Sequence, residues 1–166
     1  MEHFDYCPKC GEQTLAGDRR RIACSACGFV FYFNAAAAVA GIILKNDAVL
    51  LVTRAKEPEK GKLDLPGGFV DHNETAEQAL QREIREELNI EITDIQFLRS
   101  FPNQYLYKKI NYPVLDFFFT CRALNWLNVK PLDDVADFAF YQKENININE
   151  FAFPSTRLAM KKFLQQ

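Results

Sequence analysis

The chain contains 166 residues, 48% of them hydrophobic, and its formal net charge is -2. This composition supports a sizeable buried core and excludes an intrinsically disordered chain. The pI near 5.7 provides no overall attraction for nucleic acid or anionic membranes. The longest apolar stretch, residues 29–44, is shorter than the roughly 20 residues that a membrane-spanning helix needs. No secretory segment is visible, so we expect a cytoplasmic protein with no membrane partner.

Four of the five cysteines lie near the N-terminus in two Cys-x2-Cys pairs, and each pair is followed by glycine. The residues are Cys7, Cys10, Cys24 and Cys27. Four thiolates at this spacing suit a tetrahedral Zn2+ ion, which is structural because no position remains for a substrate. Paired disulfides and an iron or iron–sulfur site are the alternatives. The segment resembles a zinc ribbon, and we expect this module at residues 1–33 and a larger domain at residues 34–166.

Three consecutive arginines, Arg19, Arg20 and Arg21, separate the two cysteine pairs. A solvated hairpin tip is the favoured interpretation, with contact to phosphate groups as the alternative. Three arginines are too few to indicate a polyanion-binding surface. A nucleic-acid partner is therefore not favoured.

The larger domain begins with two apolar runs, residues 35–44 and 48–53, separated by Lys45-Asn46-Asp47. This pattern predicts a β-hairpin, because Asn and Asp tolerate left-handed backbone in turns. Residues 74–88 lack Gly and Pro and carry apolar side chains at helical spacing, which predicts a helix. The remaining expected elements are a strand end turning at 63–68, one bent strand or a strand pair at 90–100, strands at 112–121 and 137–141, and a terminal helix at 155–164 with Ser155 as a plausible N-cap. The order predicts an α/β fold.

The predicted helix carries Glu83, Glu86 and Glu87 within an arc of about 100° on a helical wheel. Glu83 and Glu87 fall inside the apolar stripe rather than opposite it. Burying unpaired carboxylates costs free energy, and a divalent cation lowers this cost more than Arg82 and Arg85 can. Hard oxygen ligands favour Mg2+ or Mn2+, so we interpret the helix as a metal site rather than as a solvated acidic face.

Two glycines, Gly67 and Gly68, precede this helix. They allow bare backbone N–H groups to approach a ligand closely. A glycine loop followed by metal-binding carboxylates is typical of a site for a metal-bound diphosphate, in which one carboxylate activates water. We therefore predict that Gly67 and Gly68 bind the substrate.

The pattern from Gly68 through Glu74 to Arg82-Glu83-Ile84-Arg85-Glu86-Glu87-Leu88 resembles the Nudix box, with Leu65-Pro66-Gly67-Gly68-Phe69-Val70 ahead of it. The resemblance implies an α/β/α sandwich with a mixed sheet. It implies that Glu86 and Glu87 are the first metal ligands and that Glu83 is a further ligand or the general base. It also implies that Arg82 orients a helix carboxylate and that Glu74 caps or pairs within the loop and helix.

Three positions depart from the usual box. Asn73 and Asn89 stand where glycine is common, and Leu63 stands where Trp is common. Asn is the residue after glycine that best tolerates positive φ, so we expect both asparagines to keep left-handed turns. None of the departures removes a carboxylate.

A zinc ribbon ahead of a Nudix domain resembles the NADH pyrophosphatase branch, but only Ser100 and Pro102 match that branch's signature. The resemblance implies a metal-dependent hydrolase that cleaves the diphosphate linkage of a nucleoside diphosphate linked to another moiety, such as ADP-ribose or a dinucleotide. The alternative is a non-catalytic nucleotide sensor or RNA-binding regulator that uses the ribbon. A homodimer is expected by family analogy alone.

Other candidates are aromatic or acidic. Tyr105, with Tyr107 and Tyr112, is a candidate for stacking on a nucleobase, although packing of a core or interface is the commoner role. Asp134 and Asp137 are candidates for joining the metal site.

Overall fold

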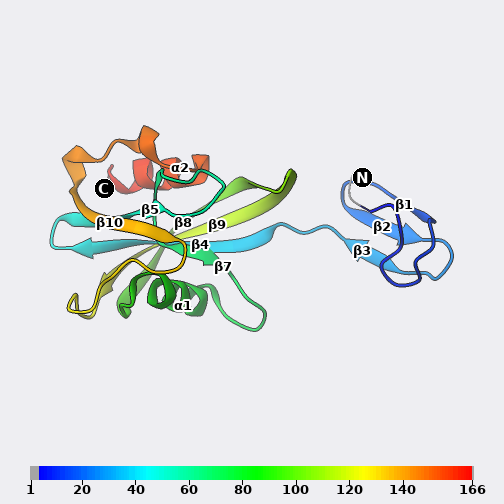
Figure 1. Ribbon diagram of the computed structural model, residues 1–166, viewed down its shortest axis with the longest axis horizontal. Coiled ribbons are helices and arrows are strands. Elements are labelled where there is room, and N and C mark those ends of the chain that lie inside the picture. The colour runs from blue at the N-terminus through cyan, green and yellow to red at the C-terminus, as the bar shows by residue number, and fades with distance from the viewer. Residues whose placement is uncertain (1–3, 166) are drawn as a thin grey trace. The chain divides into compact units, whose positions relative to one another are not determined.

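The computed structural model describes residues 4–165. The chain divides into two compact units, Met1–Ala35 and Ala36–Gln166, of which the described residues are discussed below. Figure 1 shows the chain from its N-terminal to its C-terminal end. Each unit is described by itself. Among the described residues, no helix is both long and apolar enough to span a membrane.

The first unit is a three-stranded antiparallel sheet with few buried side chains. Its strands, in spatial order, are β1 (Leu15–Gly17), β2 (Arg21–Cys24) and β3 (Val30–Tyr32). Its buried apolar residues in the described range are Cys7, Ile22 and Cys24. So few side chains cannot form an independent core, and a cross-link must supply the missing stability.

The second unit is built on a mixed seven-stranded sheet. The path β10-β5-β4-β9-β8 is antiparallel except for β4 and β9, which are parallel, while β6 pairs with β5 and β7 pairs with β4. The strands are β4 (Ala36–Lys45), β5 (Ala48–Arg54), β6 (Leu63–Asp64), β7 (Gly67–Phe69), β8 (Ile92–Tyr107), β9 (Ile110–Ala123) and β10 (Val135–Gln142).

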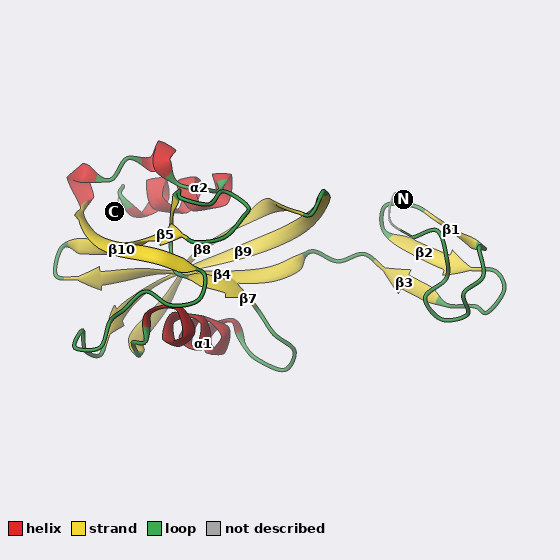
Figure 2. Cartoon of the chain, in the orientation of Figure 1, coloured by secondary structure: helices red, strands yellow, loops and turns green. Residues whose placement is uncertain are grey.

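Two α-helices cover the sheet, α1 (Ala76–Leu88) on one face and α2 (Pro154–Phe163) on the other (Figure 2). Two short 3-10 helices, η1 (Lys143–Asn145) and η2 (Ile148–Glu150), lead from β10 to α2. This arrangement is the predicted α/β/α sandwich with a mixed sheet, and the fold prediction is confirmed.

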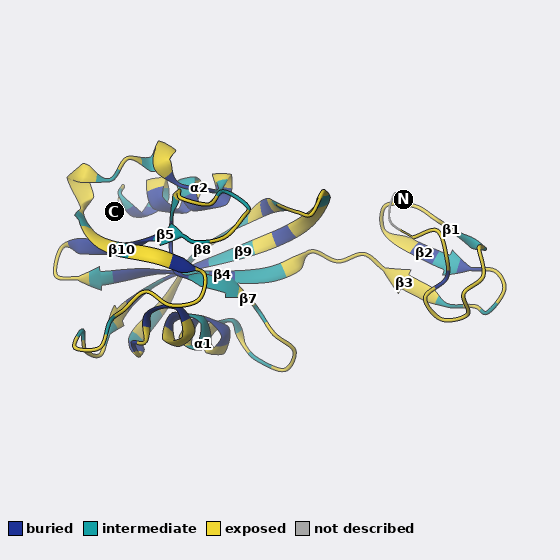
Figure 3. Cartoon of the chain, in the orientation of Figure 1, coloured by how far each residue is buried: buried dark blue, intermediate teal, exposed yellow. Residues whose placement is uncertain are grey.

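A separate hydrophobic cluster lies on each face of the sheet. Ile84 of α1 packs in a cluster with Phe119, and Met160 of α2 packs in the other with Phe118. All four side chains are at most 2% exposed. Because successive strand residues point to opposite faces, the adjacent phenylalanines of β9 supply both clusters. Figure 3 shows buried segments, in dark blue, in both helices and in the strands between them.

The β4–β5 hairpin is confirmed, with Lys45 paired to Ala48 and left-handed backbone at Asn46. The expected left-handed turns at Asn73 and Asn89 are also confirmed, with φ of 68° and 54°. Asn89 ends α1 as its C-cap. Asparagine therefore replaces glycine at both positions without changing the turn.

Both helix beginnings differ from the prediction. Helix α1 begins at Ala76 rather than residue 74, because Thr75 and Gln78 form a capping box. Helix α2 has Phe153 as its N-cap and Pro154 in the first helical turn. The prediction that Ser155 caps α2 is therefore wrong, and its hydroxyl donates a hydrogen bond to Asp116 instead.

The strands β8 and β9 are longer than predicted. The segment predicted at residues 90–100 is one continuous strand that begins at Ile92, bends at two register shifts and extends to Tyr107. The partner strand begins at Ile110, because Lys108 and Lys109 form the turn with positive φ. The extended hairpin brings Asn103 and Tyr105 to a pocket that also contains residues of β7 and α1.

Candidate functional site

The four N-terminal cysteines form a compact cluster of sulfur atoms. Their Sγ atoms all lie within 4.8 Å of one another, and the pairs Cys7–Cys27 and Cys10–Cys24 are 3.7 Å apart. Ligands at the Zn–S distance of about 2.3 Å define a tetrahedron with edges of roughly 3.8 Å. A disulfide bond needs about 2.05 Å, so the cysteines are free in this arrangement. The four residues fit a tetrahedral metal ion.

The turns between the paired cysteines explain the glycines that follow them. Gly11 and Gly28 have φ of 78° and 70°, and their N–H groups donate to the carbonyl oxygens of Cys7 and Cys24. Thr14 Oγ1 lies 3.0 Å from the Cys24 sulfur, and this hydrogen bond lowers the pKa of the Cys24 thiol to about 6. The thiolate is the metal-binding form, and the Thr14 hydrogen bond stabilises it at Cys24.

The three glutamates of α1 that were predicted to bind metal differ in exposure. Glu87 is 7% exposed, the Glu83 side chain is 17% exposed and the Glu86 side chain is 52% exposed. Two of the three therefore lie toward the interior, at the positions where the wheel places them within the apolar stripe. The third reaches solvent at the edge of the same face.

Glu87 is a buried carboxylate without a cationic partner among residues 4–165. Its Oε2 accepts a hydrogen bond of 2.9 Å from the Gly67 N–H. Burial is the main reason that the pKa of Glu87 is raised to about 8; the Gly67 hydrogen bond opposes this shift, and the nearby carboxylates of Glu83, Asp64 and Asp134 contribute to it. A buried, unpaired carboxylate in acidic surroundings fits a hard divalent cation, which stabilises its ionised form.

Arg82 joins the helix to the loop before it. Its guanidinium donates to Glu74 at 2.6 Å, to Glu83 at 2.8 Å, to Glu86 at 3.2 Å and to the Phe69 carbonyl oxygen at 2.9 Å. The structure therefore brings Arg82 together with the carboxylates that it was predicted to orient. Because Arg82 occupies one oxygen each of Glu83 and Glu86, it fixes their direction while leaving their other oxygens available.

Glu74 pairs within the loop and helix, in one of the two ways expected from the sequence. Its Oε1 accepts from the Asp71 N–H at 2.7 Å, and both of its oxygens accept from Arg82. It does not cap α1, which Thr75 does. These bonds lower the pKa of Glu74, with Arg82 as the largest cause.

The two glycines of the segment called the glycine loop lie on the short strand β7, and each is required for a different reason. A Cβ atom at Gly68 would lie 2.5 Å from the Glu83 carboxyl carbon. Gly67 has φ of 147°, and a Cβ there would collide with the carbonyl oxygen of Val39 on the paired strand. Gly68 therefore makes room for a carboxylate, and Gly67 makes room for the backbone of β4.

A pocket of about 130 Å³ extends from this loop into the space beside α2. It is lined by four residues predicted to be in the site, Gly67, Gly68, Glu87 and Tyr105, and by other side chains that no sequence pattern indicated. These further residues are Arg54, Asp64, Asn103, Asp116, Phe153 and Thr156. They come from four strands and the start of α2, so only the fold brings them together. The one available hint was Asp116, an acidic residue between apolar neighbours in the strand predicted at residues 112–121.

Arg54 and Asp64 form a buried ion pair in this pocket. Their closest atoms, Nη1 and Oδ2, are 3.1 Å apart, and Thr156 donates to Asp64 Oδ1 at 3.1 Å. Burial raises the pKa of Asp64 to about 6, against the lowering effect of Arg54. The Arg54 guanidinium also lies 4.9 Å from the centre of the Phe153 ring. The pair is thus held rigidly by α2 and by stacking.

The predicted aromatic residues lie beside the glycine loop. Tyr105 packs edge to face on Phe69, with ring centres 5.5 Å apart, and lines the pocket. Tyr107 and Tyr112 line an adjacent apolar hollow of about 300 Å³ that shares Phe69 and Tyr105. Aromatic faces at the mouth of a polar pocket suit planar ligand groups.

The two acidic candidates of the β10 region are separated. Asp134 lines the pocket and forms an ion pair with Lys56. Asp137 is exposed, accepts a hydrogen bond from the Phe138 N–H and does not line the pocket. The structure therefore brings Asp134, rather than Asp137, near the glutamates of α1.

The family of the chain follows from a match to the model described as NUDIX domain, which covers residues 34–165. The chain belongs to the Nudix family. A crystal structure of a NUDIX hydrolase from Nitrosomonas europaea superposes with a TM-score of 0.77 at 25% identity, covering 96% of this chain and 90% of that one.

Two curated relatives match parts of the chain. It is 49% identical over 59 residues to an ADP-ribose pyrophosphatase from Methanocaldococcus jannaschii, covering 36% of this chain and 35% of that protein. It is 30% identical over 99 residues to the NAD-capped RNA hydrolase NudC from Pseudomonas aeruginosa, covering 59% of this chain and 35% of that protein. The chain thus spans about a third of the length of these two relatives.

Proposed function

We propose that the chain is a metal-dependent pyrophosphohydrolase that cleaves the diphosphate linkage of a nucleoside diphosphate joined to another moiety, of the ADP-ribose or dinucleotide type. The observation that carries the proposal is Glu87, a buried carboxylate with no cationic partner in the described chain, placed against the glycine loop at the pocket. The names of the two curated relatives agree with this substrate class.

The carboxylates of Glu83, Glu86 and Glu87 would hold Mg2+ or Mn2+. When bound, such a cation polarises phosphoryl oxygens and lowers the pKa of bound water. Arg82 positions Glu83 and Glu86 for this role through its hydrogen bonds. Gly67 and Gly68 keep the loop free of side chains where the diphosphate binds, and Glu83 is either a further ligand or the general base.

The aromatic residue Tyr105 would contact the planar part of the substrate at the pocket mouth. Its ring is already held against Phe69 and lies 5.9 Å from the ring of Phe153. An aromatic ring that is fixed before binding loses little conformational entropy when a ligand stacks on it. This position supports a substrate-binding role for Tyr105.

In the first unit, we propose that Cys7, Cys10, Cys24 and Cys27 hold one structural Zn2+, within a ribbon at residues 1–33 that precedes the hydrolase domain at 34–166. The tetrahedral sulfur spacing and the glycine-closed turns support this assignment. Arg20 and Arg21 close the β1–β2 turn, where their N–H groups donate to Asp18. This supports the role of a hairpin tip for the arginine run.

The test replaces Glu86 or Glu87 with Gln and measures Mg2+-dependent hydrolysis of ADP-ribose, NADH, dinucleoside polyphosphates and sugar nucleotides. We expect a loss of about 10²- to 10⁴-fold in kcat/KM for the preferred substrate, with the melting temperature retained. Glu77→Gln, an exposed glutamate in the first turn of α1, is the matched control. Near-normal activity of both variants would refute the site. RNA affinity without hydrolysis of any diphosphate would instead support the alternative of a nucleic-acid-binding regulator.

A further inference from the structure

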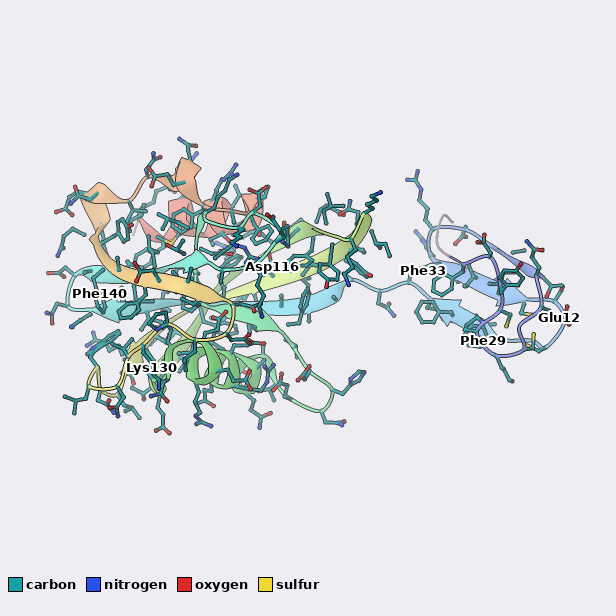
Figure 4. The ribbon with its side chains drawn as sticks, viewed as in Figure 1. Glu12, Phe29, Phe33, Asp116, Lys130 and Phe140 are labelled. Carbon is teal, nitrogen blue, oxygen red and sulfur yellow. The ribbon has the colours of Figure 1, made fainter. Side chains whose placement is uncertain are left out.

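Asp116 is a carboxylate that the proposed reaction does not use. It lies on β9, where Figure 4 labels it. Val114 and Phe118, two residues to either side, point to the same side of the strand, and all three line the pocket. The residue is partly buried. It is thus an acidic group on an apolar strand face, at the end of the pocket that α2 covers.

Two side chains hold Asp116 in place. Ser155 Oγ, at the start of α2, donates to its Oδ2 at 2.5 Å, a distance typical of a hydroxyl bonded to an ionised carboxylate. Asn103, from β8, lines the same pocket, and Ser155 and Asn103 both lower the pKa of Asp116 against the larger, raising effect of burial. Ser155 is fully buried and Asn103 is 9% exposed. The carboxylate is therefore oriented from two sides by groups that are themselves fixed.

Asp116 has no ion pair within the described part of the chain, in contrast to Asp64, which Arg54 neutralises. A carboxylate offers about four lone-pair directions. Two donors leave acceptor capacity that the protein does not satisfy. Since the group lines a cavity rather than the close-packed core, this capacity faces the space that a ligand enters.

The surroundings define what that ligand group must be. The wall beside Asp116 contains Ala38 and Ala40 of β4, whose small side chains leave open space between the strands and α2. The hydroxyls of Ser155 and Thr156 are committed to Asp116 and Asp64. An ionised carboxylate can only accept hydrogen bonds, so a ligand group at this end must present an N–H or O–H donor. The small apolar side chains of Ala38 and Ala40 and the ring of Phe153 line the same pocket, and they suit a flat ring that carries an amino group better than a sugar hydroxyl.

We propose that Asp116, held by Ser155 and Asn103, selects a substrate that carries a planar amino group, accepting a hydrogen bond from it and disfavouring analogues with an oxygen in its place. This inference rests on the proposed function, since it names the moiety that the same pocket accepts. The amino group belongs either to a nucleobase such as adenine or to a ring carboxamide. Replacement of the donor by oxygen leaves the carboxylate unsatisfied and opposed by a second acceptor, a mismatch that enzymes use to reject analogues strongly.

The experiment compares substrates that differ only in this group. One arm measures kcat/KM for ADP-ribose against inosine diphosphate ribose, and the other measures NAD against nicotinic acid adenine dinucleotide. Binding of AMP against IMP, measured by calorimetry, provides a readout that does not require turnover. We expect the wild type to prefer the amino compound at least tenfold in one arm, and the arm that responds identifies the source of the amino group.

Asp116→Asn is the main variant, because the amide has nearly the same shape but presents both a donor and an acceptor. We expect it to reduce the preference to threefold or less, through KM of the amino compound rather than through kcat. Ser155→Ala, which removes one support of the carboxylate, should reduce the preference in the same direction by a smaller factor and serves if Asp116→Asn fails to fold. Asp137→Asn, an exposed acid outside the pocket, should behave as the wild type does.

The outcomes separate this inference from the proposed reaction. Equal use of amino and oxygen compounds by the wild type, or a preference that survives within twofold in Asp116→Asn and in Ser155→Ala, would overturn the role of Asp116 while hydrolysis remained established. Preferential binding of AMP that is lost in Asp116→Asn, without hydrolysis of any substrate, would support Asp116 and refute the reaction.

Discussion

The two units of the chain place metal-binding residues in opposite relations to their cores. In the described part of the first unit, three apolar residues are buried, and two of them are cysteines of the cluster, Cys7 and Cys24, with Ile22 as the third. The candidate ligands therefore form most of this small core. In the second unit a hydrophobic cluster covers each face of the sheet, and Glu87 is inserted at the edge of a core that is already complete. On the proposed assignment, metal binding supplies stability in the first unit, whereas the fold supplies it in the second and tolerates the unfavourable burial of the Glu87 charge.

The largest effect that tests this comparison is removal of the metal from the cysteine cluster. Structural Zn2+ binds zinc-finger peptides with about 10–16 kcal/mol, so a strong chelator or Cys24→Ser should unfold the first unit. The second unit should keep its cooperative melting transition. Mass spectrometry of the native protein should give one zinc per chain in the wild type and none in the variant.

The fifth cysteine provides the control. Cys121 is buried in the sheet of the second unit and lies outside the cluster, so Cys121→Ala should retain the metal. Retention of the fold of the first unit in metal-free protein would break the comparison. Iron in place of zinc would leave the comparison intact and correct the identity of the ion.

A smaller effect is expected from replacing Gly68, which makes room for a carboxylate of the candidate site, than from replacing the cysteine ligands. In Gly68→Ala the new methyl group meets only the end of the Glu83 side chain, which can move, so stability should change little. Displacement of that carboxylate should lower kcat/KM by about 10- to 100-fold, the scale seen when groups that position a metal ligand are removed.

Gly67→Ala should behave in the opposite way. Its backbone has φ of 147° and faces the carbonyl oxygen of Val39, so the variant should lose at least about 2 kcal/mol of stability, measured by denaturant unfolding. If Gly68→Ala were the less stable of the two variants, or if it retained full activity, the distinct roles of the two glycines would be wrong.

Local chemistry explains which parts of the fold were predictable. The hairpin around Asn46, the existence of helix α1 and the left-handed turns at Asn73 and Asn89 follow from residue patterns within a few turns of chain. Helix α2 shows the limit of such patterns, because Pro154 shifts the helix start and frees Ser155 for a contact with Asp116, a residue 39 positions away in the sequence.

The candidate site divides in the same way. The carboxylates of α1 share one helix, so their proximity follows from the helical period, and Arg82 reaches Glu74 because both belong to one loop and helix. The polar residues at the α2 end come from separate strands, and Arg54, Asp64 and Asn103 carry no local signal. Their convergence depends on the parallel pairing of β4 with β9 and on the long β8–β9 hairpin.

Binding of Mn2+ in the absence of substrate, followed by electron paramagnetic resonance, shows whether a divalent metal ion shares the site of Glu87, which is buried without a basic side chain as partner. We expect Glu87→Gln to weaken Mn2+ binding at least tenfold and Glu77→Gln to leave it unchanged, with the same zinc content in both variants. Equal Mn2+ affinity in the wild type and in Glu87→Gln would contradict this expectation.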